Sequence, residues 1–490
     1  MRFVGDGRVS GGRLLARSRS ADDRWTVHGM IMSAVMRTTG PAYRVLAWFI
    51  HVVVTTFFRR VEVVGLDHVP ATGPVIFAGN HPNALLDGFV VASMCGRRPV
   101  HFMGNAKLWR YRLMALFLDA FGAVPVSPRE DHGDAANNDA AFARLFEVLE
   151  AGSSMGIFPE GISHAGSQLT RLKTGTARIA LAVGARRRVC VTIVPCGLTY
   201  MHRHRFRSQA LLHFSEPIVI DDEWLTAYVE AEGDTVRRLT AHIADALEKV
   251  TLNAPDWETL RFIHAARRLY KPTSVRLTPR TYVELSRRFV ERYLATADDP
   301  TVQRLRHDVQ NYQARLDLIG LKDHHLRQPT GVVDAWKGVL WRSAALLALL
   351  PLAIPGAVLH LPVAWIAMTA GERLSDDRDD VATLKVITSV LLLPLAYTVA
   401  ATLIGLSVGW WWGVGIGALL PLSFLASIKL VEVQANMTLA TLTNLRLSRF
   451  SLEVEELRET RRHLVARVRE VADRHADPSL PRVFSRRDFE

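Results

Sequence analysis

Two long apolar segments near the C-terminus constrain the fold of this chain more than any other feature. Residues 386–408 and 410–429 are each long enough to cross the hydrocarbon core of a membrane, which takes about 20 residues of α-helix. The second segment begins with Trp410-Trp411-Trp412, and tryptophan is enriched at membrane interfaces. Glycine recurs every four residues from Gly405 to Gly417, a spacing that lets membrane helices pack closely. The sequence therefore predicts two adjacent membrane-spanning helices.

A third apolar segment, residues 340–369, is interrupted by prolines and precedes the two spans. Lys385 lies before the pair of spans and Lys429 after it, and the positive-inside rule places both flanks in the cytosol. One more crossing would put residues 1–339 outside, although this part is rich in arginine and poor in cysteine. We therefore expect residues 340–369 to form a re-entrant hairpin bent at Pro351–Gly356. The expected location is the inner cell membrane, with several spans and with residues 61–330 facing the cytoplasm.

The remaining residues divide by composition. Residues 1–36 are rich in Arg, Gly and Ser and are predicted to be disordered. Residues 37–60 contain an apolar run that is too short to span, so we expect a helix that lies in the membrane interface. Residues 223–339 carry apolar positions at helical spacing among many charges and predict a helical region. Residues 431–490 predict a cytosolic C-terminal helix and tail.

Residues 61–222 alternate short β-rich runs with helical runs. The predicted strands include Val75–Ala78 and Val191–Pro195, and the predicted helices include Leu86–Met94. Such alternation favours an α/β domain with a largely parallel sheet flanked by helices. The predicted architecture is therefore an α/β domain, a helical region and C-terminal membrane helices.

The charge and the cysteines limit the partners of the chain. A net charge of +12 indicates an anionic partner, such as a membrane surface, a phosphorylated substrate or nucleic acid. Nucleic acid is disfavoured because the sequence has no recognisable module for it. The three cysteines lack metal-ligand spacing, so no metal site is predicted. Two basic runs, Arg186–Arg188 and His202–Arg205, are expected to lie near anionic lipid or the phosphates of coenzyme A.

The stretch Asn80–Gly88 follows the apolar run Pro74–Ala78 and contains both His81 and Asp87. A histidine beside a carboxylate suits general-base catalysis, because the carboxylate fixes the imidazole tautomer and stabilises the imidazolium. Read alone, the stretch is more typical of an ordinary turn.

Three further stretches follow, each at the end of a predicted strand. In Gly104–Arg110, the backbone N–H groups of a helix start beside Lys107 would suit a phosphate. Phe158-Pro159-Glu160-Gly161 predicts a tight turn with a charged tip, and basic residues follow it. Ile193–Gly197 contains a Val-Pro pair. Each also has an ordinary reading, as a solvated lysine, a β-turn or a strand end.

In this order, the four stretches resemble the motif signature of the phospholipid/glycerol acyltransferase superfamily, over roughly residues 60–220. His81 with Asp87 and the Phe158–Gly161 segment are its specific parts. Ser163-His164 and Leu172–Gly175 are similar to the branch of the fungal glycerol-3-phosphate and dihydroxyacetone-phosphate acyltransferases. The resemblance implies a glycerolipid acyltransferase-type domain.

Two positions depart from the broader superfamily pattern. Most members have four residues between the histidine and the aspartate, whereas five separate His81 from Asp87. Residues i and i+6 of one helix lie about 240° apart, so the two side chains can meet only if His81 lies in the loop before the helix. Ser163 occupies the position where the superfamily has an arginine expected to hold phosphate, and it cannot supply charge.

The resemblance implies acyl transfer from acyl-CoA or acyl carrier protein to a hydroxyl of glycerol-3-phosphate or dihydroxyacetone phosphate, at the lipid bilayer. His81 would be the general base and Asp87 its orienting partner, with no metal or other cofactor. It implies these substrate-binding positions: Asn83, Lys107, Glu160, Gly161, Ser163, His164, Arg171 and Lys173. Two alternatives remain, namely an acyltransferase for lysophosphatidate and an inactive lipid-binding protein of the same fold.

Overall fold

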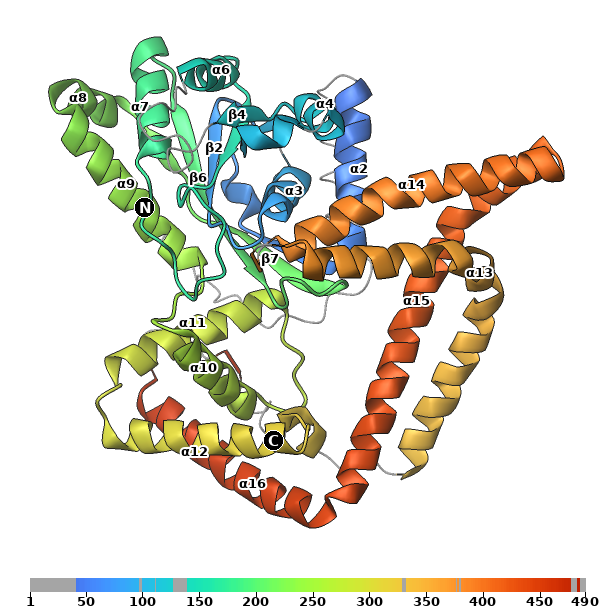
Figure 1. Cartoon of the computed structure of the whole chain (residues 1–490). Helices are drawn as coiled ribbons and strands as arrows, with labels where there is room; N and C mark the ends of the chain where they lie inside the picture. The colour runs from blue at the N-terminus through green and yellow to red at the C-terminus, as the bar shows by residue number, and fades with distance from the viewer. Residues whose placement is uncertain are drawn as a thin grey trace, which may run out of the picture.

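The structure, a computed structural model of the chain, describes residues 41–96, 99–110, 112–126, 139–327, 332–375, 377–378, 380–476 and 483–484. The predicted disorder of residues 1–36 lies outside the described residues. Figure 1 shows a sheet covered by helices, a group of shorter helices, and three long helices that extend away from both.

Eight strands form one largely parallel sheet in the order β1-β7-β6-β2-β5-β3-β4, with β8 beside β6. Strands β7 and β8 run antiparallel to β6, and the other pairs are parallel. This confirms the predicted fold class. The strands are β1 (Phe58–Val64), β2 (Val75–Gly79), β3 (Val100–Asn105), β4 (Val124–Val126), β5 (Ser154–Ile157), β6 (Val191–Tyr200), β7 (Ser208–Phe214) and β8 (Ile218–Ile220).

Strand β6 continues past Pro195, where the sequence predicted its end. On one edge it pairs with β8 up to Ile193 and with β7 from Cys196 onward, so Pro195 lies between the two partners. The Pro195 carbonyl faces this gap and accepts a hydrogen bond from Ser215 N at 2.8 Å. Because the missing N–H of a proline faces the same way as its carbonyl, it breaks no strand pairing here. The strand therefore runs on to Tyr200.

The sheet is buried on both faces because its central strands alternate their side chains between two cores. On one face, Val75 and Phe77 of β2 pack with α2 and α3. On the other face, Ile76 and Ala78 pack with α6, α7 and α9. These helices are α2 (Pro41–Phe57), α3 (Leu85–Met94), α6 (Asp139–Glu150), α7 (Gly175–Arg187) and α9 (Glu232–Val250); α4 (Arg112–Ala120) and α8 (Asp222–Glu230) lie beside them.

Helix α9 belongs to this sheet unit, although the sequence assigned residues 223–339 to a separate helical region. Its residues Leu239, Ile243 and Leu247 are buried in the same core as Ile76 and Ile193 of the sheet. The boundary predicted near residue 222 therefore cuts through one packed core, because a charged amphipathic helix looks alike whether it covers a sheet or other helices.

A second unit combines segments that lie far apart in the sequence. Its helices α10 (Trp257–Tyr270), α11 (Pro279–Ala295) and α12 (Pro300–Leu318) share a core with α16 (Ser451–Arg474) from beyond the apolar segments. The buried Asp323 joins the two parts, because its carboxylate accepts hydrogen bonds from Tyr312 OH at 3.1 Å and from Arg461 Nε at 2.9 Å. The predicted C-terminal helix is thus part of this bundle.

Three helices of the described chain are long and apolar enough to cross a membrane, namely α13 (Val332–Arg373), α14 (Val381–Ser407) and α15 (Trp410–Arg449). Helix α13 runs continuously through Pro351 and Pro355 and bends near its middle in Figure 1, and the re-entrant hairpin of residues 340–369 stays a prediction. The Ser423 hydroxyl of α15 accepts from Gly356 N at 3.0 Å and donates to Ala353 O at 3.2 Å. These bonds join α15 to the backbone of α13 on both sides of Pro355.

The chain before α13 and the end of α15 lie close together. Arg446, at the end of α15, donates a hydrogen bond of 2.6 Å to Gly320 O, which precedes α13. Glu432 of α15 pairs with Arg207 of the sheet unit at 2.6 Å. Chain segments that pack together must lie on one side of a bilayer, so this structure allows only an even number of crossings. If α14 and α15 cross, α13 adds no net crossing.

Helix α2 has the form expected of an interfacial helix. Ile50 and Val54 are buried against the sheet unit, whereas Val45, Trp48 and Val52 leave an exposed apolar stripe. An exposed stripe of this kind suits the headgroup region of a bilayer. Residues 58–60, which the sequence assigned to this helix, begin β1 instead.

Paired single-cysteine labelling tests the even number of crossings. Leu318 and Leu452 lie on opposite sides of the apolar helices in the sequence and are 86% and 85% exposed. With Cys190 replaced by serine, Leu318→Cys and Leu452→Cys should react with an impermeant maleimide from the same side of sealed vesicles. Labelling from opposite sides would refute this topology.

Candidate active site

A buried carboxylate organises the candidate site. Asp87, in the first turn of α3, is 0% exposed and accepts three hydrogen bonds. The donors are Asn83 N at 2.7 Å, Tyr200 OH at 2.6 Å and Nδ1 of His81 at 2.9 Å. Burial, together with the charge of Asp87, raises the pKa of Tyr200 well above its usual value, so Tyr200 remains a donor. An ionised carboxylate fixes Nδ1 as the protonated nitrogen of His81, which leaves Nε2 as a base.

His81 lies in the loop between β2 and α3, which confirms the position that its spacing to Asp87 predicted. Its imidazole ring stacks on Phe158, with ring centroids 4.0 Å apart and planes 2° apart. Its backbone is held on both sides, because His81 N donates to Glu160 Oε1 at 2.9 Å and His81 O accepts from His164 N at 3.0 Å. Asp87 and Phe158 therefore orient the ring, while Glu160 and His164 hold the main chain of His81.

Ala84 provides the turn that accommodates the extra residue between His81 and Asp87. It has φ 42° and ψ −128°, a conformation that is unfavourable for a residue with a Cβ. Immediately around it, Asn83 O accepts from Leu86 N and Ala84 O accepts from Asp87 N, both at 3.1 Å. The strained residue closes the loop tightly enough to bring Asp87 beneath His81.

Glu160 is the second buried carboxylate of the site, at 3% exposed. Besides His81 N, it accepts from Thr170 N at 2.9 Å and Thr170 Oγ1 at 3.0 Å, and it pairs with Nε2 of His164. All these partners are protein groups. Glu160 therefore joins the Phe158–Gly161 turn to the loop that contains His81.

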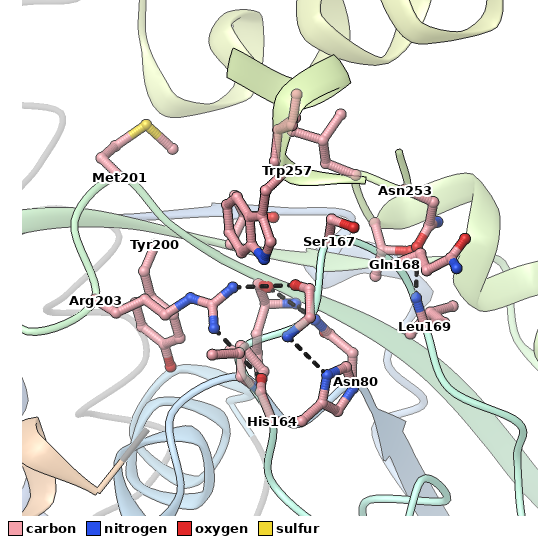
Figure 2. A pocket seen from close by; sticks show the side chains of 18 of the residues that line it. Asn80, His164, Ser167, Gln168, Leu169, Tyr200, Met201, Arg203, Asn253 and Trp257 are labelled. Carbon is pink, nitrogen blue, oxygen red and sulfur yellow. Dashed lines mark hydrogen bonds between the residues drawn. The ribbon is translucent and has the colours of Figure 1, made fainter. Parts of the chain in front are cut away.

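A cavity of about 760 Å³ opens beside His81. Figure 2 shows Asn80 and His164 on one side of it, with Arg203 and Trp257 facing them. Its walls come from both units, because the sheet unit supplies the His81 loop and the turn after β6, while α10 closes the other side. Four arginines lie on its walls: Arg203, Arg205, Arg261 and Arg378.

The structure brings together only some of the predicted site residues. His81, Glu160 and His164 line the cavity, and Asp87 and Asn83 are buried behind His81. Four others are absent from the cavity walls: Gly161, Ser163, Arg171 and Lys173. Lys107 lies in the short helix η2 (Ala106–Arg110), but its side chain is outside the described part of the structure.

Lys173 lies behind the Phe158–Gly161 turn. A Cβ added to Gly161 would come within 2.6 Å of Lys173 Nζ, so this lysine packs directly over the glycine. Gly161 has φ 79°, which also favours glycine. The packing of the two residues gives Lys173 a structural place beside the turn.

The sequence interpretation missed Tyr200 and Arg203 as site residues. Tyr200 was missed because β6 was expected to end at Pro195. Arg203 belongs to the basic run His202–Arg205, whose charge was noticed but whose place on the cavity wall depends on the turn after β6. Arg378 follows α13, and no sequence signal linked it to His81.

Two family models match the sequence of this chain. Residues 60–199 match the acyltransferase family model, and residues 262–480 match the model of the C-terminal domain of glycerol-3-phosphate acyltransferase 2. The first match contains the whole His81, Asp87 and Glu160 constellation. Residues 60–199 are therefore similar to acyltransferases, and residues 262–480 are similar to the C-terminal domain of one of them.

More narrowly, the chain is homologous to the glycerol-3-phosphate O-acyltransferases of Saccharomyces cerevisiae. It is 36% identical to O-acyltransferase 2 over 289 residues, which are 56% of this chain and 39% of the relative. It is 34% identical to O-acyltransferase 1 over 288 residues, which are 55% of this chain and 37% of the relative. An uncharacterized acyltransferase of Schizosaccharomyces pombe is 27% identical over 460 residues, 74% of this chain and 68% of its own length. The chain thus spans about two-fifths of each budding-yeast relative.

The strain at Ala84 gives a testable prediction. Glycine adopts positive φ without steric cost, so Ala84→Gly should raise the unfolding free energy by about 1 kcal/mol and keep the His81–Asp87 geometry. Ala84→Val should lower stability and activity together. The midpoint of thermal unfolding in detergent, measured beside transferase activity, checks both.

Ala241→Gly is the matched control, since Ala241 is exposed within α9 and has ordinary helical geometry. That change should lower the unfolding midpoint, because glycine costs about 1 kcal/mol relative to alanine inside a helix. Equal destabilisation by Ala84→Gly and Ala241→Gly would show that Ala84 carries no strain.

Proposed function

We propose that this protein is a membrane-bound acyltransferase that moves a fatty acyl group from acyl-CoA or acyl carrier protein to a hydroxyl of glycerol-3-phosphate. The hydrogen-bonded series Tyr200–Asp87–His81 carries the proposal, because it leaves one imidazole nitrogen as a base at the wall of a large basic cavity. The homology to yeast glycerol-3-phosphate O-acyltransferases supports the choice of acceptor.

In the proposed reaction, Nε2 of His81 takes the proton of the acceptor hydroxyl as its oxygen attacks the thioester carbonyl carbon. The carbon–sulfur bond then breaks, and the protonated imidazole returns the proton to the departing thiolate. Asp87 stabilises the imidazolium between these steps, and Tyr200 and Asn83 keep Asp87 in place. The thioester is already activated, so the reaction needs no metal.

The setting of the reaction follows from the apolar helices. We propose that α14 and α15 anchor the enzyme in the inner cell membrane and that both packed units face the cytoplasm, where acyl-CoA and acyl carrier protein occur. The products of glycerol-phosphate acylation partition into the bilayer, so a membrane anchor holds the enzyme next to its product.

Dihydroxyacetone phosphate is an equivalent acceptor in this scheme, because it also presents a hydroxyl and a phosphate. Lysophosphatidate is the second candidate, and it would need room for its own acyl chain. An inactive lipid-binding protein of the same fold would not require the intact Asp87–His81 pair.

Assays on membranes with labelled acceptors test the proposal directly. Glycerol-3-phosphate, dihydroxyacetone phosphate and lysophosphatidate are each combined with acyl-CoA or acyl carrier protein. His81→Ala should lower kcat by about 10²–10⁴-fold, the usual contribution of a general base, and should change the KM values far less. Unchanged turnover in His81→Ala would end the mechanism, and no turnover with any wild-type combination would favour the inactive lipid-binding protein.

Tyr200→Phe tests whether the support of Asp87 affects catalysis. The change removes one donor to a buried carboxylate, so we expect kcat to fall about tenfold, equivalent to ~1.4 kcal/mol. Tyr312→Phe is a matched control, because Tyr312 OH donates to the buried Asp323 at 3.1 Å in the helical bundle. It should lower stability similarly without lowering kcat; an equal loss of kcat in both variants would reduce Tyr200 to a structural role.

A further inference from the structure

The proposed acceptor carries a phosphate, and several of the residues first expected to bind it are absent from the cavity walls. Arg171 and Lys173 are not on its walls, and Ser163 is uncharged. Phosphate is bound well by the planar guanidinium of arginine, which presents two parallel N–H donors. The four arginines of the walls are therefore the groups to compare.

Arg203 differs from the other three in burial. Arg205, Arg261 and Arg378 are exposed, whereas Arg203 is only partly accessible. Partial burial reduces the solvent screening of its charge and strengthens any contact with an anion. The Trp257 ring lies 5.8 Å from the Arg203 guanidinium and covers it on the cavity side of α10. Figure 2 shows the two side chains lying against each other.

Arg203 is also tied to the loop that holds His81. Its two terminal guanidinium nitrogens donate to His164 O at 3.3 Å and to Gly166 O at 3.4 Å. His164 N in turn donates to His81 O. On the other side, Asn83 Nδ2 donates to Arg203 O at 3.4 Å. His164 and Gly166 therefore hold the guanidinium of Arg203, and Asn83, from the loop that contains His81, holds its main chain.

We propose that Arg203 binds the phosphate of the acceptor and thereby directs the acceptor hydroxyl toward Nε2 of His81. This inference rests on the proposed function. The positive charge at the acceptor site would come from Arg203, in the turn after β6. The alternatives are that Arg203 only ties the loops together, or that it binds the phosphates of acyl-CoA. Each alternative makes a different kinetic prediction.

The test compares acceptors with and without phosphate. In Arg203→Gln, the KM for glycerol-3-phosphate should rise about 10- to 100-fold, since hydrogen bonds to a charged group contribute about 1.5–3 kcal/mol. The KM for the acyl donor should change less than about threefold. With glycerol as acceptor, kcat/KM should change little, because no phosphate is present. An equal loss of kcat/KM for glycerol and glycerol-3-phosphate would mean that Arg203 only holds the loops together. A rise confined to the KM of the acyl donor would mean that Arg203 binds the donor instead.

Three further variants sharpen the result. Arg203→Lys keeps the positive charge but lacks the two parallel N–H donors, so it should give an intermediate KM for glycerol-3-phosphate. This variant remains informative if Arg203→Gln fails to fold. Lys173→Gln should leave the KM for glycerol-3-phosphate within about threefold; a larger rise there than in Arg203→Gln would overturn the inference. Arg237→Gln removes one exposed positive charge of α9 outside the cavity and controls for net charge.

Equilibrium dialysis with labelled glycerol-3-phosphate separates this inference from the proposed function. If the wild-type protein binds the acceptor but transfers no acyl group, the proposed function fails. Arg203→Gln must then still weaken binding at least tenfold, or the inference about Arg203 fails as well.

Discussion

The carboxylate of Asp87 is the group on which the site depends. A charge that is removed from water costs several kcal/mol unless polar partners replace the lost solvent. Its three donors come from the loop before α3 and from the far end of β6, so satisfying one buried charge fixes a loop, a helix and a strand together. His81 owes its orientation to this requirement.

Glu160 is a second buried carboxylate whose hydrogen-bond donors join separate segments of the chain. It is buried, and its partners include the backbone of His81 and both the backbone and side chain of Thr170. The two sequence segments with the strongest resemblance to acyltransferases, around His81 and around Phe158–Gly161, are thus parts of one hydrogen-bonded structure. Glu160 holds the main chain of His81, and its own oxygens accept hydrogen bonds from protein donors.

The sequence predicted those parts of the protein that depend on local patterns. Alternating apolar runs gave the α/β fold class, and the spacing of His81 and Asp87 correctly placed the histidine in the loop. The errors arose where distant contacts decide. Pro195 does not end β6 because two different strands pair on either side of it. Pro351 and Pro355 lie inside a continuous α13, and Ser423 of α15 bonds the backbone on both sides of Pro355.

The cavity could not be predicted for the same reason, since its walls come from two units that meet only in the folded chain. Arg203 and Arg378 are separated in the sequence by α10, α11, α12 and α13, yet both lie on its walls. Neither position follows a pattern of spacing. Charge alone indicated an anionic partner, and only the tertiary structure selects which arginines face His81.

The apolar helices are joined to the active site at two points. Arg378, in the connection between α13 and α14, lies on the cavity wall. Ala382 and Val386, at the start of α14, are buried in the same core as Leu86 and Phe89 of α3, the helix that carries Asp87. Helix α14 therefore packs on α3, the helix whose Asp87 orients His81. Because the apolar helices also return to the bundle through Arg446 and Gly320, the cavity is held next to the entry point of these helices. A product with an acyl chain would then leave the cavity beside the membrane in which it dissolves.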